Sequence, residues 1–152
     1  MVELSRPRKR MLRLAKEYEG RLIDFDNKDS AQCADFSAFL IKNATGQTIW
    51  GNAIRTGDQD NIDIINKSEF NAEFIPPSED PEPGDLLVED TGNDIGHVSL
   101  VEKVHKDGKV TVYEQNYNGD AETNPQGVEK RTRNTASDDN WGKVHGYLRI
   151  ED

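Results

Sequence analysis

Residues 24–39, DFDNKDSAQCADFSAF, hold the only cysteine of the chain and several of its aspartates. Phe36 and Leu40 follow Cys33 at helical spacing, which predicts a helix over about residues 31–42. The thiol then lies in the first helical turn, where unpaired N–H groups and the helix dipole favour an anion. A single cysteine on a helix is usually a small core residue. This stretch alone therefore leaves both a structural role and a nucleophile open.

The length and composition are those of a small soluble domain. With 152 residues the chain has the size of one domain, and we expect residues 1–152 to form it. No run is long and apolar enough to span a membrane, and no apolar segment follows the basic N-terminus, so we expect neither membrane insertion nor a signal peptide. A single cysteine excludes an internal disulfide and a cysteine-rich zinc site.

The net charge of −10 is unevenly distributed. Residues 1–21 carry seven Lys/Arg against three Asp/Glu, whereas the rest of the chain carries twelve against 26. An acidic main body argues against binding nucleic acid or an anionic membrane. The basic residues near the N-terminus are interpreted as the solvated start of a helix: Arg6, Arg8, Lys9 and Arg10.

Helical patterns come first and strand patterns follow. The spacing of Met11, Leu14 and Tyr18 predicts a helix over about residues 8–19. A short apolar segment with a buried Trp50 and a possible helical turn near Ile62 follow the cysteine helix. Strands are predicted at residues 86–89, 97–105, 109–116, 128–133 and 143–150. Short turns between them imply an antiparallel sheet, so the fold class is α+β.

Of the three histidines, His97 is the best candidate for chemistry. It follows a glycine and opens an apolar strand, and glycine there permits close approach of a backbone or ligand. A hairpin at residues 107–108 places His97 roughly opposite residue 118 of the next strand, and a slip of a few residues brings it beside Glu114 or Asn116. A carboxylate there would fix the tautomer of the imidazole. Taken alone, Glu114 and Asn116 are better interpreted as ordinary polar residues of an edge strand.

Six motifs taken in order resemble one family. They are DFDNKDSAQCADF, WGNA, EPGDLLV, GHVSLVEKV, TVYEQNYNG and VHGYLRI, and they cover about residues 22–150. Together they resemble the CHAP (cysteine, histidine-dependent amidohydrolase/peptidase) domains of phage endolysins and bacterial peptidoglycan hydrolases. GHV or PGD alone is weak, but the ordered set is specific.

The resemblance implies a papain-like fold, with N-terminal helices packed on a four- to six-stranded antiparallel sheet. It also implies that Cys33 is the nucleophile, His97 the general base and Glu114 the residue that orients the histidine. Asn116 matches the polar residue that completes the site. Gln32 sits beside the nucleophile, where it would stabilise the oxyanion together with the Cys33 N–H.

A metal site is the second implication. Asp24, Asp26 and Asp35 occupy positions one, three and twelve of an EF-hand-like loop, but Lys28 and Asp29 depart from a true EF-hand at positions five and six. Some calcium-dependent CHAP domains resemble this pattern, and three carboxylates with carbonyls and water would suit Ca²⁺. The alternative is a solvated acidic loop.

The expected function is hydrolysis of an amide bond in peptidoglycan by a cysteine nucleophile. The bond is either the N-acetylmuramoyl-L-alanine linkage (amidase) or a stem or cross-bridge peptide bond (endopeptidase). We expect a phage-encoded protein made in the host cytoplasm, or a domain of a larger secreted or virion protein. It either relies on a separate cell-wall-binding domain or binds the wall by its groove alone. The alternatives are a calcium-dependent wall-binding or adaptor module with an idle thiol, and a toxin-like amidase effector.

Overall fold

The computed structural model describes residues 3–23, 33–92, 95–115, 127–134 and 143–152. Within these residues the α-helices are α1 (Arg6–Glu17), α2 (Cys33–Thr45) and α3 (Gln59–Asn66). The strands are β1 (Asn71–Ile75), β2 (Leu86–Asp90), β3 (His97–Val104), β4 (Lys109–Glu114), β5 (Glu129–Asn134) and β6 (Lys143–Glu151). Two short 3-10 helices, η1 (Ala53–Arg55) and η2 (Lys106–Gly108), lie in the connections.

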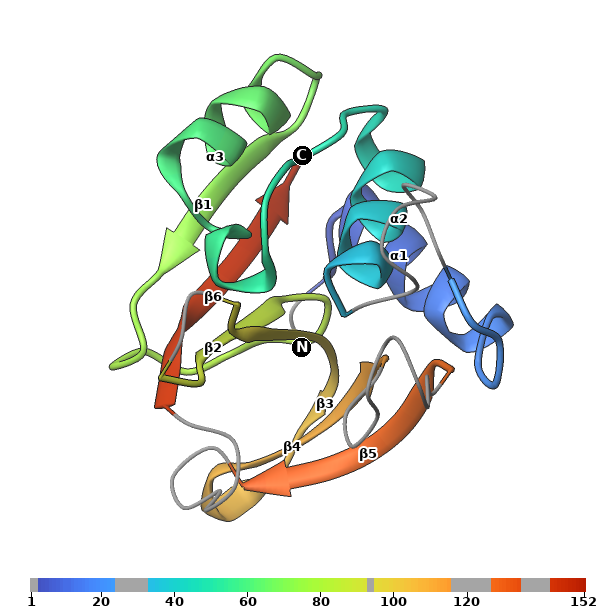
Figure 1. Ribbon diagram of the computed structural model, residues 1–152, viewed down its shortest axis with the longest axis vertical. Coiled ribbons are helices and arrows are strands. Elements are labelled where there is room, and N and C mark those ends of the chain that lie inside the picture. The colour runs from blue at the N-terminus through green and yellow to red at the C-terminus, as the bar shows by residue number, and fades with distance from the viewer. Residues whose placement is uncertain (1–2, 24–32, 93–94, 116–126, 135–142) are drawn as a thin grey trace.

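All strands belong to one antiparallel sheet in the order β1-β6-β2-β3-β4-β5. In Figure 1, α1 and α2 lie side by side against the sheet, while α3 packs beside β1 at its far end. α2 contacts β3, the strand next to the centre, and α1 contacts both β3 and β6. The predicted α+β class, with helices on an antiparallel sheet, is confirmed.

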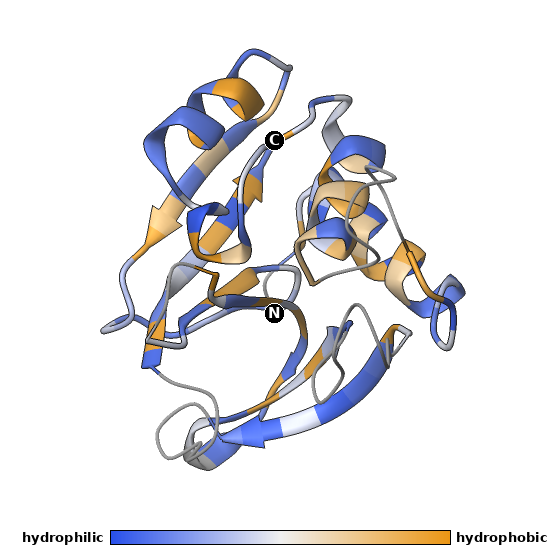
Figure 2. Ribbon diagram, viewed as in Figure 1, coloured by the Kyte–Doolittle hydropathy of each residue, from blue (hydrophilic) through white to orange (hydrophobic). Residues whose placement is uncertain are grey.

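The main hydrophobic core lies between the two N-terminal helices and the sheet. Met11 and Ala15 of α1 and Phe36 and Leu40 of α2 are fully buried there. The strand residues that meet them are Leu86, Val88, Val98, Leu100, Leu148 and Ile150. A second cluster forms from residues that alternate with these along the strands: Ile75, Leu87, Val101, Val110, Val112 and Tyr147. Figure 2 shows this hydrophobic centre and, in contrast, a largely hydrophilic β5.

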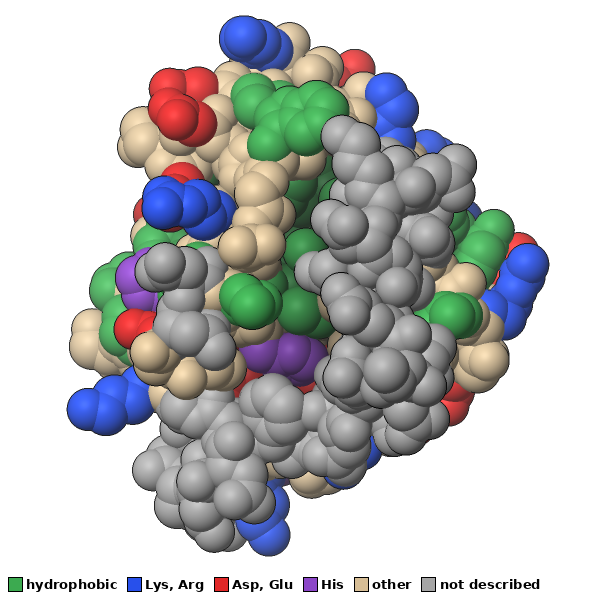
Figure 3. All heavy atoms as spheres, in the orientation of Figure 1, with side chains coloured by type: hydrophobic (Ala, Val, Ile, Leu, Met, Phe, Trp, Pro, Cys, Tyr) green, Lys and Arg blue, Asp and Glu red, His purple; other side chains and the backbone are tan. Residues whose placement is uncertain are grey.

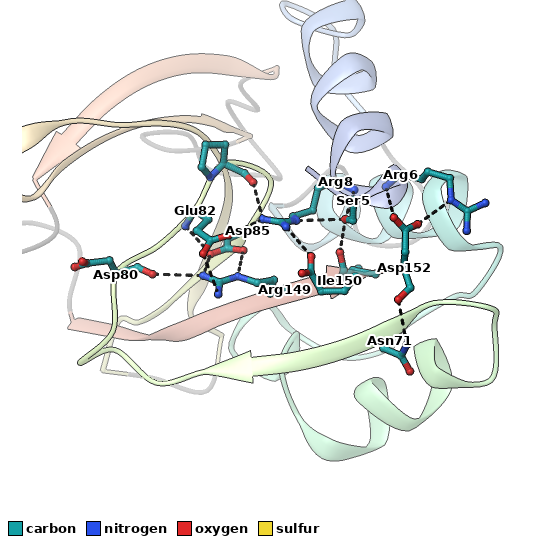
Figure 4. Close-up of polar contacts among 12 residues, drawn as sticks. Ser5, Arg6, Arg8, Asn71, Asp80, Glu82, Asp85, Arg149, Ile150 and Asp152 are labelled. Carbon is teal, nitrogen blue, oxygen red and sulfur yellow. Dashed lines mark hydrogen bonds and ion pairs between the residues drawn. The ribbon is translucent and has the colours of Figure 1, made fainter. Parts of the chain in front are cut away.

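Two buried or half-buried arginines fasten the chain termini to the turn that precedes β2. Arg8 donates to Glu82 Oε1 at 3.0 Å and pairs with Glu151 Oε1 at 2.6 Å. Arg149 donates to both carboxylate oxygens of Asp85, at 2.9 and 2.8 Å (Figure 4). Gly84 in this turn has a φ of +88°, and a Cβ there would lie 2.5 Å from the Arg8 side chain. The PGD motif is therefore a structural turn that two arginines hold.

Several predictions about individual elements were wrong. Arg8 is buried rather than solvated, because its guanidinium pairs with Glu82 in the turn before β2. Trp50 is 67% exposed rather than buried. Its backbone N–H and C=O are held by the buried side chain of Asn61, at 3.0 and 2.9 Å, so the chain turns the indole outward. β1 was not predicted, because its five residues alternate too briefly to stand out from the polar segment before them.

Among the residues the structure describes, no helix is long and apolar enough to cross a membrane.

Candidate active site

The thiol of Cys33 lies at the very start of α2. Cys33 is the first residue of the helix and is buried. Phe36 and Leu40, on the same face of α2, are fully buried in the main core and fix the position of the helix on the sheet. The predicted placement of the thiol in the first helical turn is confirmed, so it lies where the helix dipole stabilises negative charge.

His97 begins β3, and the glycine before it makes its position possible. Gly96 has a φ of +71°, and a Cβ there would lie 2.7 Å from Ile54 Cβ and 2.8 Å from the carbonyl oxygen of Glu89. The Ile54 N–H donates to the carbonyl of Ile95 at 2.8 Å, which joins η1 to the start of β3. The expectation that glycine allows another backbone to approach His97 is thus confirmed.

The imidazole of His97 links the thiol to a buried carboxylate. Its Nε2 lies 2.7 Å from Glu114 Oε1, and the thiol of Cys33 lies close enough to the ring to influence the pKa of His97. Since Nε2 is engaged by Glu114, Nδ1 is the ring nitrogen left for Cys33. Burial lowers the pKa of His97, but the hydrogen bonds and negative charge of Cys33 and Glu114 outweigh this and raise it to about 10. The imidazole is therefore held in its protonated form at neutral pH.

The strand register that joins His97 to Glu114 differs slightly from the predicted one. Val104 pairs with Val110, and η2 replaces the expected two-residue hairpin. A bulge follows, after which Leu100 pairs with Tyr113. This shifts β4 about two residues relative to the predicted pairing, which would have placed residue 118 opposite His97. Glu114 consequently lies within direct hydrogen-bonding reach of His97.

A second layer of charged residues, which the sequence did not reveal, lies behind Glu114. Arg133 donates to the two carboxylate oxygens of Glu89 at 2.6 and 2.7 Å and to Glu114 Oε1 at 3.3 Å. Arg131 Nε lies 3.5 Å from Glu114 Oε2. Glu89 is brought here because it pairs directly with His97 across β2 and β3. The one feature of the sequence that could have indicated this layer is the spacing of Arg131 and Arg133, which are two residues apart and therefore lie on the same side of a short strand.

Gln115 is another buried residue that sequence reasoning did not single out. Its amide accepts from the Ile23 N–H at 2.7 Å and donates to the Ile23 carbonyl at 2.9 Å. The end of β4 is thereby tied to the residues immediately before the acidic stretch. The YEQN motif thus places Glu114 against the histidine and the next side chain against the N-terminal segment.

Half of the predicted site residues lie outside the part of the chain that the structure describes: Asp24, Asp26, Gln32 and Asn116. The remaining predicted calcium ligand, Asp35, is buried in the first turn of α2, two residues from the thiol. Among the described residues, no group of three or more His, Cys, Asp or Glu side chains forms a metal site. The calcium site stays a prediction.

The surroundings of the thiol helix are partly open and apolar. A small cavity of about 80 Å³ is lined by residues of α2 and of the segment that follows it: Ala34, Asp35, Ala38, Thr48, Ile49, Trp50 and Gly51. Ile95, beside Gly96, is half-exposed. In Figure 3 a histidine side chain lies at the bottom of a recess, with hydrophobic side chains above it.

Comparisons with known proteins identify the family and the fold of the chain. A sequence model of the family described as the CHAP domain matches residues 24–116, more than half of the chain. The crystal structure of a wild-type endolysin, LysIME-EF1, is similar with a TM-score of 0.75 at 20% identity, over 97% of this chain and 64% of that one. The structure of Ly7917 is similar with a TM-score of 0.66 at 18% identity, over 95% of this chain and 62% of that one.

This chain thus spans less than two thirds of the length of either solved structure. At these identities the structural likeness concerns the fold. No curated protein matches the chain.

Proposed function

Because the chain belongs to the CHAP domain family, we propose that it is a peptidoglycan hydrolase that cleaves an amide bond with Cys33 as nucleophile. The observation that carries this proposal is the buried His97–Glu114 pair, with 2.7 Å between Nε2 and Oε1, and a Cys33 thiol close enough to the imidazole to raise its pKa. A nucleophile, a base within reach and a third group that orients the base are the pattern of covalent acyl-transfer catalysis. Endolysins among the solved structures of the same fold support a cell-wall substrate.

The proposed reaction passes through a thioester. Sγ of Cys33, whose proton is on His97, attacks the carbonyl carbon of the amide and forms a tetrahedral intermediate. His97 then donates that proton to the leaving nitrogen as the C–N bond breaks, which releases an amine and leaves an acyl-thioester. Water attacks the thioester while His97 takes its proton, and the carboxylate product leaves as the thiolate re-forms. The Glu114 carboxylate keeps its contact with Nε2 throughout and orients the imidazole.

The oxyanion of the tetrahedral intermediate needs donors beside the nucleophile. In this proposal the Cys33 N–H, at the start of α2, supplies one and the side chain of Gln32 supplies the other. Asn116 is proposed as the polar residue that completes the site next to Glu114. These assignments follow the family pattern and match positions adjacent in sequence to the described site.

Calcium is proposed to hold the segment that leads into α2. The donor set of Asp24, Asp26 and Asp35 consists of carboxylate oxygens, which suits Ca²⁺. The ion would neutralise the acidic loop and fix the start of the helix that carries Cys33.

The substrate is peptidoglycan, and both an N-acetylmuramoyl-L-alanine amidase and a stem or cross-bridge endopeptidase fit the site. A net charge of −10 disfavours the approach to polyanionic walls. We therefore propose that a separate cell-wall-binding domain brings this one to its substrate.

The test is wall lysis by the Cys33→Ala variant, with mass spectrometry of the muropeptides that the unaltered protein releases. We expect the variant to lose lysis while keeping its melting temperature within a few degrees. New free muramic-acid carboxylates would identify an amidase, and new peptide termini an endopeptidase. Undiminished lysis by Cys33→Ala would refute the proposed mechanism and favour an adaptor role for the domain.

A further inference from the structure

The guanidinium of Arg133 lies between two buried carboxylates. One of its nitrogens, Nη1, donates to Glu89 Oε1 at 2.6 Å and to Glu114 Oε1 at 3.3 Å. The other, Nη2, donates to Glu89 Oε2 at 2.7 Å. All three side chains are at most 6% exposed. Glu114 Oε1 is the same oxygen that meets His97 Nε2, so Arg133 and the imidazole share one acceptor atom.

Charged side chains are unexpected in this cluster, because its cross-strand neighbours are hydrophobic. Arg133 pairs across the sheet with Val110, and Arg131 with Val112, both members of the second hydrophobic cluster. Replacing a buried ion pair by hydrophobic residues is often neutral or stabilising, so stability alone explains such a pair poorly. The apolar surroundings strengthen each interaction between the charges. We therefore look for the function of the Arg133–Glu89 ion pair in its contact with Glu114.

We propose that Arg133 and Glu89 form a positioning unit of the active site. In this unit Glu89 clamps the Arg133 guanidinium in place, and Arg133 holds the Glu114 carboxylate in line with His97 Nε2. The unit touches no substrate. It acts through Glu114 on the imidazole, and through the imidazole on Cys33. This inference deepens the proposed function and rests on it for its catalytic meaning.

The charges around Glu114 show why Arg133 is needed. His97 faces it from β3, Glu89 from β2, and Arg131 and Arg133 from β5, while Cys33 from α2 lies beyond the imidazole. Without Arg133, the two buried carboxylates would face one another with the His97 imidazole on one side and, at 3.5 Å from Glu114 Oε2, Arg131, which also pairs with Glu129. Burial and the charge of Glu114 raise the pKa of Glu89, while the hydrogen bonds and charge of Arg133 oppose this. Loss of Arg133 therefore weakens the negative charge that faces the imidazolium and removes a donor to Glu114 Oε1.

The test compares three single variants of the full chain. Arg133→Gln removes the central cation, and Glu89→Gln removes its clamp without changing side-chain shape. Arg149→Gln is the matched control, since Arg149 makes an equivalent forked pair with the buried Asp85 away from the site, at 2.9 and 2.8 Å. Each variant is assayed for kcat and KM on solubilised peptidoglycan from pH 5 to 10. The rate of Cys33 alkylation by iodoacetamide is measured over the same range, together with the melting temperature.

We expect Arg133→Gln to lower kcat by roughly tenfold or more with little change in KM, and to move the acid limb of the pH profile upward by about one unit. Glu89→Gln, which removes a negative charge, moves the acid limb downward. The pH profile of Cys33 alkylation likewise shifts upward in Arg133→Gln and downward in Glu89→Gln. Arg149→Gln lowers the melting temperature to a similar extent as Arg133→Gln but leaves both profiles in place.

The inference is overturned if neither Arg133→Gln nor Glu89→Gln moves the profiles more than Arg149→Gln does. If Arg133→Gln fails to fold, the isosteric Glu89→Gln variant decides alone. The alkylation profile requires no wall substrate, so it tests the inference separately from the proposed function. Failure of the proposed function would instead appear as undiminished lysis by Cys33→Ala.

Discussion

Replacing Glu114 by Gln tests how strongly the carboxylate controls the active-site histidine. The amide keeps the shape of the side chain but removes the charge that lies 2.7 Å from His97 Nε2. A hydrogen bond to a charged group contributes about 1.5–3 kcal/mol. Since one pKa unit corresponds to about 1.4 kcal/mol, the loss lowers the pKa of His97 by about one to two units. From about 10 it would fall to about 8–9.

The sign of the pH effect follows from the role of the imidazolium. His97 must be protonated to donate to the leaving nitrogen, so the alkaline limb of activity follows its pKa. We expect this limb near pH 10 in the unaltered protein and about one to two units lower in Glu114→Gln. Because the folded pKa lies above the unfolded value of about 6.5, the stability that His97 contributes is full below that pH. It is lost as the pH rises toward about 10.

The assay is the pH profile of wall hydrolysis, with chemical denaturation at each pH as a second measurement. Glu102→Gln is the matched control, because Glu102 is half-buried on β3 and pairs with Lys130 at 3.5 Å, away from the thiol. An alkaline limb that stays in place in Glu114→Gln, or moves equally in Glu102→Gln, would refute this account of the carboxylate.

The remaining predictions concern the frame of the site. Gly96→Ala should lower the melting temperature markedly and reduce lysis, because the φ of +71° is strained for alanine and its Cβ would lie 2.7 Å from that of Ile54. Gly92→Ala measures the backbone strain alone, because a Cβ there meets open space at a similar φ of +86°. It should lower the melting temperature less than Gly96→Ala does. Millimolar Ca²⁺ should raise the melting temperature of the unaltered protein and not that of Asp35→Asn. Equal melting temperatures with calcium and with chelator would remove the calcium site. Asn61→Ala should destabilise the fold more than Trp50→Ala, since the Asn61 amide ties two carbonyls and one N–H together, whereas the indole is exposed. Thermal denaturation of the pair checks this, and a larger loss in Trp50→Ala would contradict it.

Local patterns were sufficient for the elements that carry the chemistry. The helical spacing after Cys33 and the apolar run after His97 predicted α2 and β3 to within a few residues. The hairpin between β3 and β4 placed His97 roughly opposite residue 118, so only a slip of a few residues would bring it beside Asn116 or Glu114; in the structure His97 contacts Glu114. Such patterns succeed because each depends on contacts within one element or between neighbours in the chain.

The sequence did not predict features that depend on residues far apart in the chain. Arg8 resembles a solvated helix residue until the turn before β2 is folded against it. The site role of Arg133 depends on Glu89, which lies 44 residues earlier in the chain and is separated from it in the sheet by β3 and β4. Trp50 was predicted to be buried from its hydrophobicity, whereas the bonds from Asn61 to its backbone determine its orientation. In each case the deciding interaction is a side chain from elsewhere in the fold.

The central claim is that Cys33 is the nucleophile of wall hydrolysis, and its being the only cysteine permits a direct measurement. The protein is treated with increasing iodoacetamide at pH 7, and the modified fraction is determined by mass spectrometry alongside residual lysis. The account predicts rapid addition of one carbamidomethyl group and a loss of lysis that equals the modified fraction at every point. Full lysis by fully alkylated protein would contradict it.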